Sequence, residues 1–421
     1  MTTSLVTASP PKALGRDFTG LWTATGLANL GDGLYLLVLP LIALQLTTSA
    51  GLIAGVTVML TLAWPVFGFQ AGLLVDRVDR RRMVAGVNLV RAVALAALTV
   101  ALLTGSASVI LLYAVALVLG VGETLVDTSL AALVPQTVPH QENLGRANAR
   151  LEVAQTVTNQ FIGPPLGGLL AGFGLAWATG TSALLYVGAL AGLALMRGRY
   201  RAAVTAPSTP RPPLRQEILA GLRFTWANPL LRNLTLITAA MNVFWAAWVA
   251  VLVIYVVAPG PVGLSTPQYG LLLIVMAAGG IAGANAVEPL RRRLGARRLL
   301  ALDVVGTIVL VGTPALTTNP FLLAAAMFVG GAGSAVWRVI VAMVRQTVTP
   351  AELLGRVYSA NRVVSWGVLP IGAALGGVVA QAYGVRAVFV VAGLASFGLL
   401  AAYAAAIKPG PLALALAPKA T

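Results

Sequence analysis

The sequence contains no cysteine and only one histidine, and charged residues make up just 10% of its 421 residues. The lack of cysteine excludes disulfides and thiolate metal sites. So few charges cannot cover the surface of a water-soluble domain of this length. No P-loop pattern for binding nucleotide phosphates occurs, so the sequence gives no sign of ATP-driven chemistry, and we expect neither a cofactor nor enzymatic activity.

Acidic residues are also scarce, with 12 Asp and Glu against 28 Lys and Arg and a net charge of +16. Such a balance can indicate nucleic-acid binding. Here the basic residues stand in short clusters between apolar runs, as the positive-inside rule of membrane proteins requires. We therefore expect a lipid bilayer as partner and no nucleic acid.

Apolar residues supply 58% of the chain, in twelve stretches between Phe18 and Ala405. Each approaches the ~20 residues that cross a bilayer core. The connections alternate between short uncharged turns and basic segments, which predicts an even number of spans with both termini cytoplasmic. The polar start, Met1 to Arg16, does not precede a cleavable signal peptide, because the apolar stretch after it is too long. The expected location is the cell (inner or plasma) membrane.

The two halves of the chain are related. The run QTV, Glu142 and LGR within 136–146 recurs within 346–356, at an offset of about half the chain. Duplicated halves in one orientation are typical of secondary transporters, whose bundles rock about a central site, and argue against a receptor or a membrane enzyme. We predict an all-α polytopic membrane protein with 12 transmembrane helices in two pseudo-symmetric six-helix bundles.

The longest connection separates the halves, and its part from Leu214 to Trp226 suits an amphipathic helix at the membrane surface. The predicted organisation is a cytoplasmic tail (1–17), an N-terminal bundle (18–196), a cytoplasmic linker (197–229), a C-terminal bundle (230–406) and a cytoplasmic tail (407–421).

A glycine, an acid four residues later and a basic cluster end the second span. This run resembles the loop 2–3 signature of the major facilitator superfamily, and the resemblance covers the whole chain. It departs from the pattern at Asp79, where the family usually has glycine. The resemblance implies a cytoplasmic latch that holds the outward-facing state; plain positive-inside charge is the alternative. The latch residues are Gly72, Asp76, Arg77, Arg80 and Arg81.

The fifth span contains a glycine–proline run that is similar to the motif of antiporters in this superfamily. Prolines bend a helix and glycines allow close backbone contact, and the sequence does not separate bending from packing. The run comprises Gly163, Pro164, Pro165, Gly167 and Gly168. Separately, residues 29–33, Asn88, Arg91 and 144–148 are similar to the macrolide-efflux and enterobactin-exporter branch of drug:proton antiporters.

Three acids lie at bilayer depth, where ionisable groups are costly and usually functional. Asp32 and Glu123 lie ~21 Å and ~18 Å from the cytoplasmic ends of spans 1 and 4, at 1.5 Å per residue. Asp127 follows Glu123 by one helical turn. One of two carboxyls sharing a cavity can carry a proton, so we predict Asp32 as the principal proton carrier with Glu123 as its partner. The alternative for Asp32 is a local bend beside Gly31 and Gly33.

Three arginines lie within the spans. Arg338 can pair with Asp127 or Glu123 across the cavity or extend to the interface, while Arg91 and Arg362 lie near cytoplasmic ends, where we expect structural roles. The C-terminal half carries aromatic residues where the N-terminal half has acids. An aromatic wall opposite carboxylates suits a large, lipophilic, often cationic solute; lipid-facing aromatics are the alternative. The predicted cavity residues are Asn29, Asn242, Trp245, Trp248, Trp337 and Arg338.

These features predict proton-coupled secondary active efflux of lipophilic small molecules, of the drug or antibiotic type, by a monomer that alternates access. An exporter of an endogenous siderophore or metabolite, an importer, and a non-transporting sensor or scramblase on the same scaffold remain open.

Overall fold

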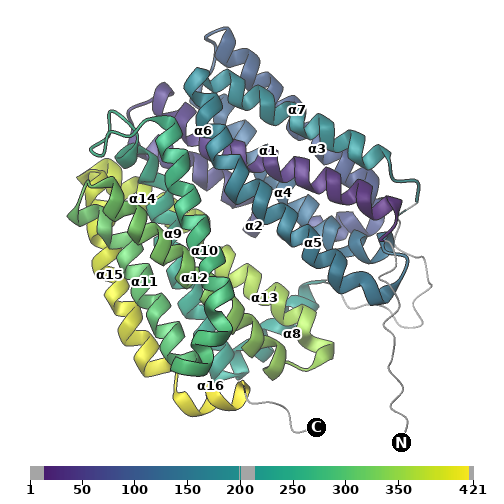
Figure 1. The fold of residues 1–421 in the computed structure, drawn as a ribbon, viewed down its shortest axis with the longest axis vertical. Helices are drawn as coiled ribbons and strands as arrows, with labels where there is room; N and C mark the ends of the chain where they lie inside the picture. The colour runs from purple at the N-terminus through teal and green to yellow at the C-terminus, as the bar shows by residue number, and fades with distance from the viewer. Residues whose placement is uncertain (1–13, 199, 201–213, 417–421) are drawn as a thin grey trace, which may run out of the picture.

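The computed structural model describes residues 14–198, 200 and 214–416, and almost all of them are helical. Figure 1 shows two bundles of long helices. The N-terminal bundle consists of α1 (Arg16–Leu46), α2 (Ala50–Arg77), α3 (Arg80–Leu103), α4 (Val109–Thr137), α5 (Leu144–Thr156), α6 (Gly163–Phe173) and α7 (Leu175–Ala194). After α8 (Leu214–Ala227), the C-terminal bundle consists of α9 (Pro229–Val256), α10 (Thr266–Leu294), α11 (Ala296–Leu316), α12 (Pro320–Val348), α13 (Leu354–Trp366), α14 (Leu369–Tyr383) and α15 (Val385–Ala406), followed by α16 (Pro409–Ala415).

Twelve membrane spans result. Eleven stretches are long and apolar enough to cross a membrane, with α13 and α14 counted together as one of them. The remaining span is the fifth, in which α5 and α6 are joined by a π-helical turn, Val157–Ile162. The predicted twelve-helix, two-bundle fold is confirmed.

The two halves repeat each other's packing. The contacts of α2 with α4, α1 with α7 and α3 with α7 recur as α10 with α12, α9 with α15 and α11 with α15. Both fifth spans begin with a 3₁₀ turn, Gln141–Asn143 and Ala351–Leu353. Both are then interrupted near mid-length, so the sequence repeat corresponds to a structural repeat.

Short polar side chains start many of these helices. Ser49, Ser108 and Asn319 accept hydrogen bonds from backbone N–H groups in the first turns of α2, α4 and α12. Each bond satisfies donors that a helix start would otherwise leave unpaired. Such caps allow the uncharged connections to be only a few residues long.

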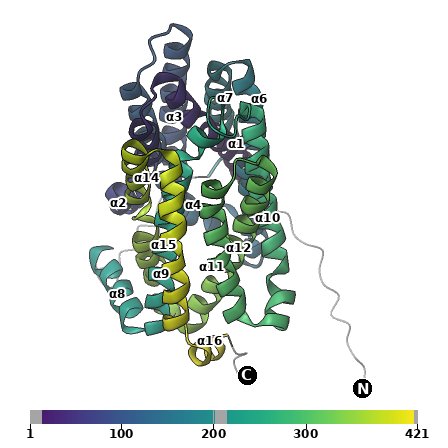
Figure 2. The same ribbon diagram turned by 90° about the vertical axis from the view of Figure 1, so that its left-hand side faces the viewer.

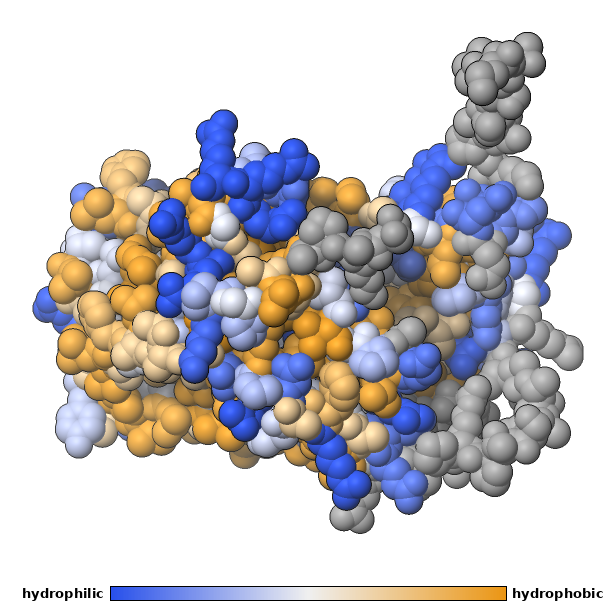
Figure 3. All heavy atoms as spheres, turned by 90° about the horizontal axis from the view of Figure 1, so that it is seen from below, coloured by the Kyte–Doolittle hydropathy of each residue, from blue (hydrophilic) through white to orange (hydrophobic). Residues whose placement is uncertain are grey.

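The halves contact each other mainly through α2 with α14 and α6 with α10. Helices α6 and α14 form the parts of the fifth and eleventh spans that lie farthest from α8 and α16. Figure 1 accordingly shows the bundles meeting beside α6 and α14 and diverging toward α5 and α16. Figure 2 shows α8 and α16 at one end of the molecule, and Figure 3 shows many hydrophilic side chains on the face seen from below.

Helix α8 occupies the place predicted for an amphipathic helix, but it packs on α13. A Cβ on Gly221 would collide with the backbone carbonyl of Arg356, and Glu217 lies 3.6 Å from the Arg356 guanidinium. The linker helix is therefore attached to the eleventh span.

Candidate functional site

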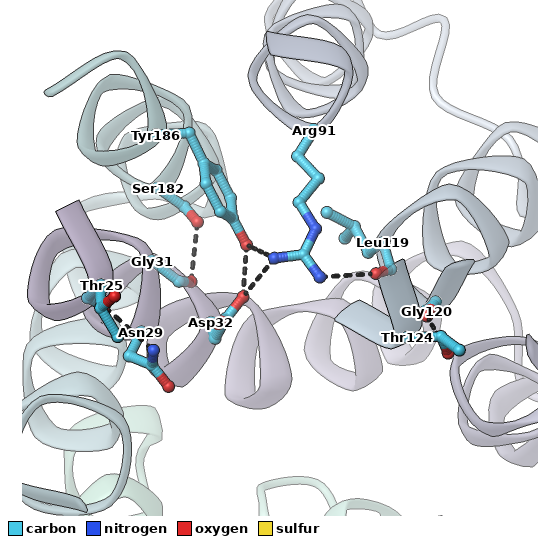
Figure 4. A network of polar contacts seen from close by, with 10 residues as sticks. All are labelled: Thr25, Asn29, Gly31, Asp32, Arg91, Leu119, Gly120, Thr124, Ser182 and Tyr186. Carbon is cyan, nitrogen blue, oxygen red and sulfur yellow. Dashed lines mark hydrogen bonds and ion pairs between the residues drawn. The ribbon is translucent and has the colours of Figure 1, made fainter. Parts of the chain in front are cut away.

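A buried polar network lies at the centre of the N-terminal bundle (Figure 4). Asp32 on α1 is 6% exposed and Arg91 on α3 is 1% exposed. Arg91 Nη1 lies 3.4 Å from Asp32 Oδ1, and the Tyr186 hydroxyl on α7 donates to the same oxygen. Arg91 Nη2 donates to the Leu119 carbonyl on α4 at 3.1 Å. One buried ion pair thus connects four helices.

Glycines provide the space for this network. A Cβ on Gly122 would clash with Nε of Arg91, and a Cβ on Gly33 would clash with the backbone of Asn159. Close by, Ser182 Oγ on α7 donates to the Gly31 carbonyl at 2.8 Å. Small residues let the helix backbones approach closely, so the charged side chains are enclosed rather than left facing lipid.

The three predicted acids line one small pocket of about 30 Å³. Asn29, which donates to the Thr25 carbonyl of its own helix at 2.9 Å, lines it too. A cavity of this size holds one or two waters. The structure therefore brings together the three acids and Asn29, and it places Asp32 and Glu123, whose shared depth the sequence predicted, in the same pocket. The described side chains include no group of three or more His, Cys, Asp or Glu residues that could hold a metal ion.

Two of the acids differ in their partners. Asp32 has a cation and a hydroxyl on one oxygen. Glu123 forms no ion pair or side-chain hydrogen bond within the described part of the chain, although Asp32, Asp127, Arg91 and Arg362 are the charged groups around it. Glu123 therefore differs from Asp32 and Asp127 in having no ion-pair partner that would be lost when its carboxyl group binds or releases a proton.

Asp127 connects the pocket to the other half. Its Oδ2 lies 2.9 Å from Nη2 of Arg362 on α13. The Arg362 guanidinium stands over the ring of Trp64 on α2, 3.7 Å from the centroid, and 5.5 Å from the centroid of Trp366. An ion pair and a cation–aromatic contact therefore bridge the bundles. Arg362, not Arg338, is the cation that pairs with Asp127.

The predicted aromatic wall is largely inside the C-terminal bundle. Trp248 is 1% exposed within the core, and Trp337 is 4% exposed and donates to Thr238 Oγ1 at 2.9 Å. Trp245 is half-buried and packs against the core. Neither Trp248 nor Trp337 lines the acid pocket, so the structure does not bring these two rings to the acids.

Two further cavity candidates also lie apart from the acids. Asn242 donates to the Ser365 carbonyl at 2.5 Å, within the C-terminal half. Arg338 is exposed and forms no ion pair within the described ranges. Its side chain reaches neither Glu123 nor Asp127, because its helix α12 packs on α10 and α11 instead of α4.

The proposed latch can be followed in part. Gly72, Asp76 and Arg77 belong to α2, but the structure does not describe their surroundings. Asp79 caps α3 by accepting from Arg82 N at 3.1 Å, with φ −61°. That backbone needs no glycine, which explains how the departure from the family pattern is tolerated.

The latch arginines that are described lie in the N-terminal half. Arg81 Nε donates to the Leu193 carbonyl on α7 at 2.9 Å, and Arg80 is buried. The contact of Arg81 ties α3 to α7 and does not reach the C-terminal bundle.

The glycine–proline run provides close helix packing, one of the two roles that the sequence left open. A π-helical turn stands directly before Gly163, and a Cβ on Gly163 would lie 2.6 Å from Cα of Gly33. A Cβ on Gly168 would lie 2.8 Å from the Thr266 carbonyl of α10. Pro164 and Pro165 face Gly270, and Gly167 faces Leu34. The run thus follows an irregular turn and also carries the contact between bundles.

Sequence reasoning missed the partners of the acids. Arg91 and Arg362 were expected to be structural, yet they pair with Asp32 and Asp127. The signal for Arg91 was its depth, ~16 Å into α3 from Arg80 at 1.5 Å per residue. Asp303 on α11 was also missed; it is 2% exposed, and its Oδ2 has no hydrogen-bond partner in the described residues.

Two six-helix repeats around buried acids define this chain as a polytopic membrane protein of the major facilitator fold. Solved structures agree: the nucleoside transporter NupG matches with a TM-score of 0.72 at 14% identity, over 94% of this chain and 100% of that one. A bacterial homologue of the iron transporter ferroportin, in an inward-facing state, matches with a TM-score of 0.71 at 17% identity, over 94% and 99%.

The family model described as transmembrane secretion effector matches residues 11–413. The chain belongs to this family of the major facilitator superfamily. It is 27% identical to the multidrug efflux pump Tap of Mycolicibacterium fortuitum, over 86% of this chain and 88% of Tap. It is also 27% identical to the enterobactin exporter EntS of Shigella boydii, over 75% of this chain and 74% of EntS.

Proposed function

We propose that this protein exports lipophilic small molecules by alternating access, driven by proton entry, and that it works as a monomer in the cell membrane. The observation that carries the proposal is the gathering of Asp32, Glu123 and Asp127 in one mid-depth pocket. Acids buried at this depth are typical of proton relays in transporters. The similarity to an efflux pump and an exporter supports outward transport.

Within the pocket, Glu123 is the better proton carrier. The sequence favoured Asp32, but a carboxylate paired with Arg91 and bonded to Tyr186 is stabilised in its charged form. Glu123 has no such partner, so protonation costs it no contact. We assign Asp32 to positioning Arg91 and Glu123 to binding the transported proton.

The positions of the contacts between the halves fit an inward-facing conformation. They join α2 to α14 and α6 to α10, far from α8 and α16. If the termini are cytoplasmic, as the basic connections predict, the outer side is closed. Substrate would then enter between the inner parts of the bundles.

Dye efflux from intact cells tests the assignment. Glu123→Gln removes the proton site while keeping the shape, so we expect proton-driven efflux to fall to background with the protein still inserted. Glu288→Gln is the matched control, because Glu288 is an exposed acid that bonds Arg291 and Arg292 near the end of α10. Efflux by Glu123→Gln at the wild-type rate would show that the proton binds elsewhere.

A second candidate is export of an endogenous siderophore or metabolite, which the similarity to the enterobactin exporter favours. Comparing drug susceptibility with siderophore secretion in a deletion strain separates the two. A non-transporting sensor or scramblase would give no saturable, gradient-dependent uptake of dye in inverted vesicles.

A further inference from the structure

The Arg362 guanidinium occupies a site with the features of an organic-cation receptor. It lies 3.7 Å from the ring centroid of Trp64, and the Trp366 ring stands at 64° to that of Trp64 with centroids 5.9 Å apart. Asp127 supplies a carboxylate 2.9 Å away. Two tryptophan faces and one acid are the groups that bind quaternary or delocalised cations.

The ion pair in this site is not fully buried. The side chains of Arg362 and Asp127 are 42% and 37% exposed, although they bridge the two bundles. Partly exposed ion pairs contribute only about 0–1 kcal/mol, so another cation can replace Arg362 at little cost. Asp127 also lines the pocket of Asp32 and Glu123, which places the site beside the proposed proton carrier.

The backbone is irregular on both sides of the site. Pro65 follows Trp64 inside α2, and α13 ends at Trp366, where Gly367 separates it from α14. A Cβ on Gly367 would lie 3.7 Å from Cβ of Pro65. Helices bend at proline and glycine, so the two rings stand beside irregular backbone where the two halves contact each other.

We propose that Trp64, Trp366 and Asp127 form a binding subsite for lipophilic organic cations, and that Arg362 is a tethered cation that fills it in the absence of substrate. The inference rests on the proposed export function and names its substrate class. Each half supplies one tryptophan. An incoming cation would therefore replace the contact of Arg362 with Asp127 and Trp64, and would itself contact both halves. Arg362 therefore sets the affinity for cations by competing with them.

Equilibrium binding of radiolabelled tetraphenylphosphonium to the purified full-length protein in detergent tests this competition. We expect Arg362→Gln to bind the probe about tenfold more tightly than wild type, because the competing charge is gone. Trp366→Leu and Asp127→Asn should each weaken binding about tenfold. Arg292→Gln and Trp226→Leu are matched controls that should leave affinity unchanged, since both side chains are exposed and lie on α10 and α8, outside the proposed subsite.

A neutral probe separates charge from space. Triphenylphosphine oxide has similar rings without the charge, so its affinity should change less than twofold in Arg362→Gln. Equal tightening for both probes would mean that the substitution merely opened a hole, and would overturn the assignment. Unchanged or absent tetraphenylphosphonium binding in Arg362→Gln, with normal elution on size exclusion, would overturn it as well.

Two further measurements keep the test decisive. If Arg362→Gln does not fold, Arg362→Met carries the same expectation with a side chain of similar length. If neither folds, equal binding by Trp366→Leu and Trp226→Leu overturns the subsite, and selective loss in Trp366→Leu supports it. Binding needs no proton gradient, so a protein that binds as expected but exports nothing contradicts the proposed function alone.

Discussion

Helices α3 and α11 hold equivalent places in the two halves, but α3 buries a basic side chain, Arg91, and α11 buries an acidic one, Asp303. Each packs on the next helix and on the last span of its half. Arg91 lies against Gly122 of α4, and Asp303 lies against Gly333 of α12, in both cases where a Cβ on the glycine would clash with the charged side chain. The two positions correspond within two residues of the sequence repeat.

The difference between them lies in their partners. Arg91 reaches a carboxylate, a hydroxyl and a carbonyl. Asp303 has no cation within ion-pair distance in the described ranges, and its Oδ2 is unbonded. A lone buried charge is far more costly than a buried neutral acid, so we expect Asp303 to carry a proton. The same scaffold thus supports a fixed ion pair in one half and a neutral acid in the other.

The largest expected effect comes from removing the cation of the N-terminal half. Arg91→Met leaves Asp32 buried without its counter-charge, which should lower the free energy of unfolding by about 3–5 kcal/mol. Steric trapping in detergent or bicelles measures this free energy of unfolding. The double variant Asp32→Asn with Arg91→Met removes both charges and should recover most of the loss. A loss below about 1 kcal/mol in the single variant would show that the ion pair does not hold the four helices together.

A smaller loss of unfolding free energy is expected when a tyrosine hydroxyl is removed, and the loss should be larger where the hydroxyl donates to a charged acceptor than where it donates to a neutral one. Tyr186→Phe removes the donor to Asp32 and should cost about 1.5–3 kcal/mol, whereas Tyr403→Phe should cost about 0.5–1.5 kcal/mol. Both side chains are buried, but Tyr403 donates to the Arg297 backbone carbonyl at 2.6 Å, which is a neutral acceptor. The same unfolding measurement compares them, and equal losses would contradict the assignment of a charged acceptor to Tyr186.

The architecture could be predicted from the sequence because each feature that defines it depends only on position along the chain. Apolar length defines the spans, basic clusters predict the topology, and the repeat at 136–146 and 346–356 defines the halves. The shared level of Asp32 and Glu123 also followed from counting residues along single helices. Each of these arguments needs only position along the chain.

The partners of the acids could not be found in this way. Whether Arg362 meets Asp127, or Arg338 does, depends on which helices of the two halves touch and how each is rotated. Trp64 stands in an apolar run with nothing to distinguish its inward face. Asp303 did carry a signal, since it is an acid within an apolar span at the place of Arg91, but comparing the halves residue by residue was needed to see it.

The smallest expected effect is the sharpest test of the comparison, because one chemical change is made in both halves. Asp303→Asn replaces a neutral acid by a neutral amide and should alter the free energy of unfolding by less than about 1 kcal/mol. Asp32→Asn leaves Arg91 buried without its counter-charge and should cost about 3 kcal/mol or more. Thermal unfolding of the two variants at the same pH ranks them. If Asp303→Asn is as damaging as Asp32→Asn, then Asp303 is ionised and paired in the folded protein, and the two halves do not differ in the way their buried charges are held.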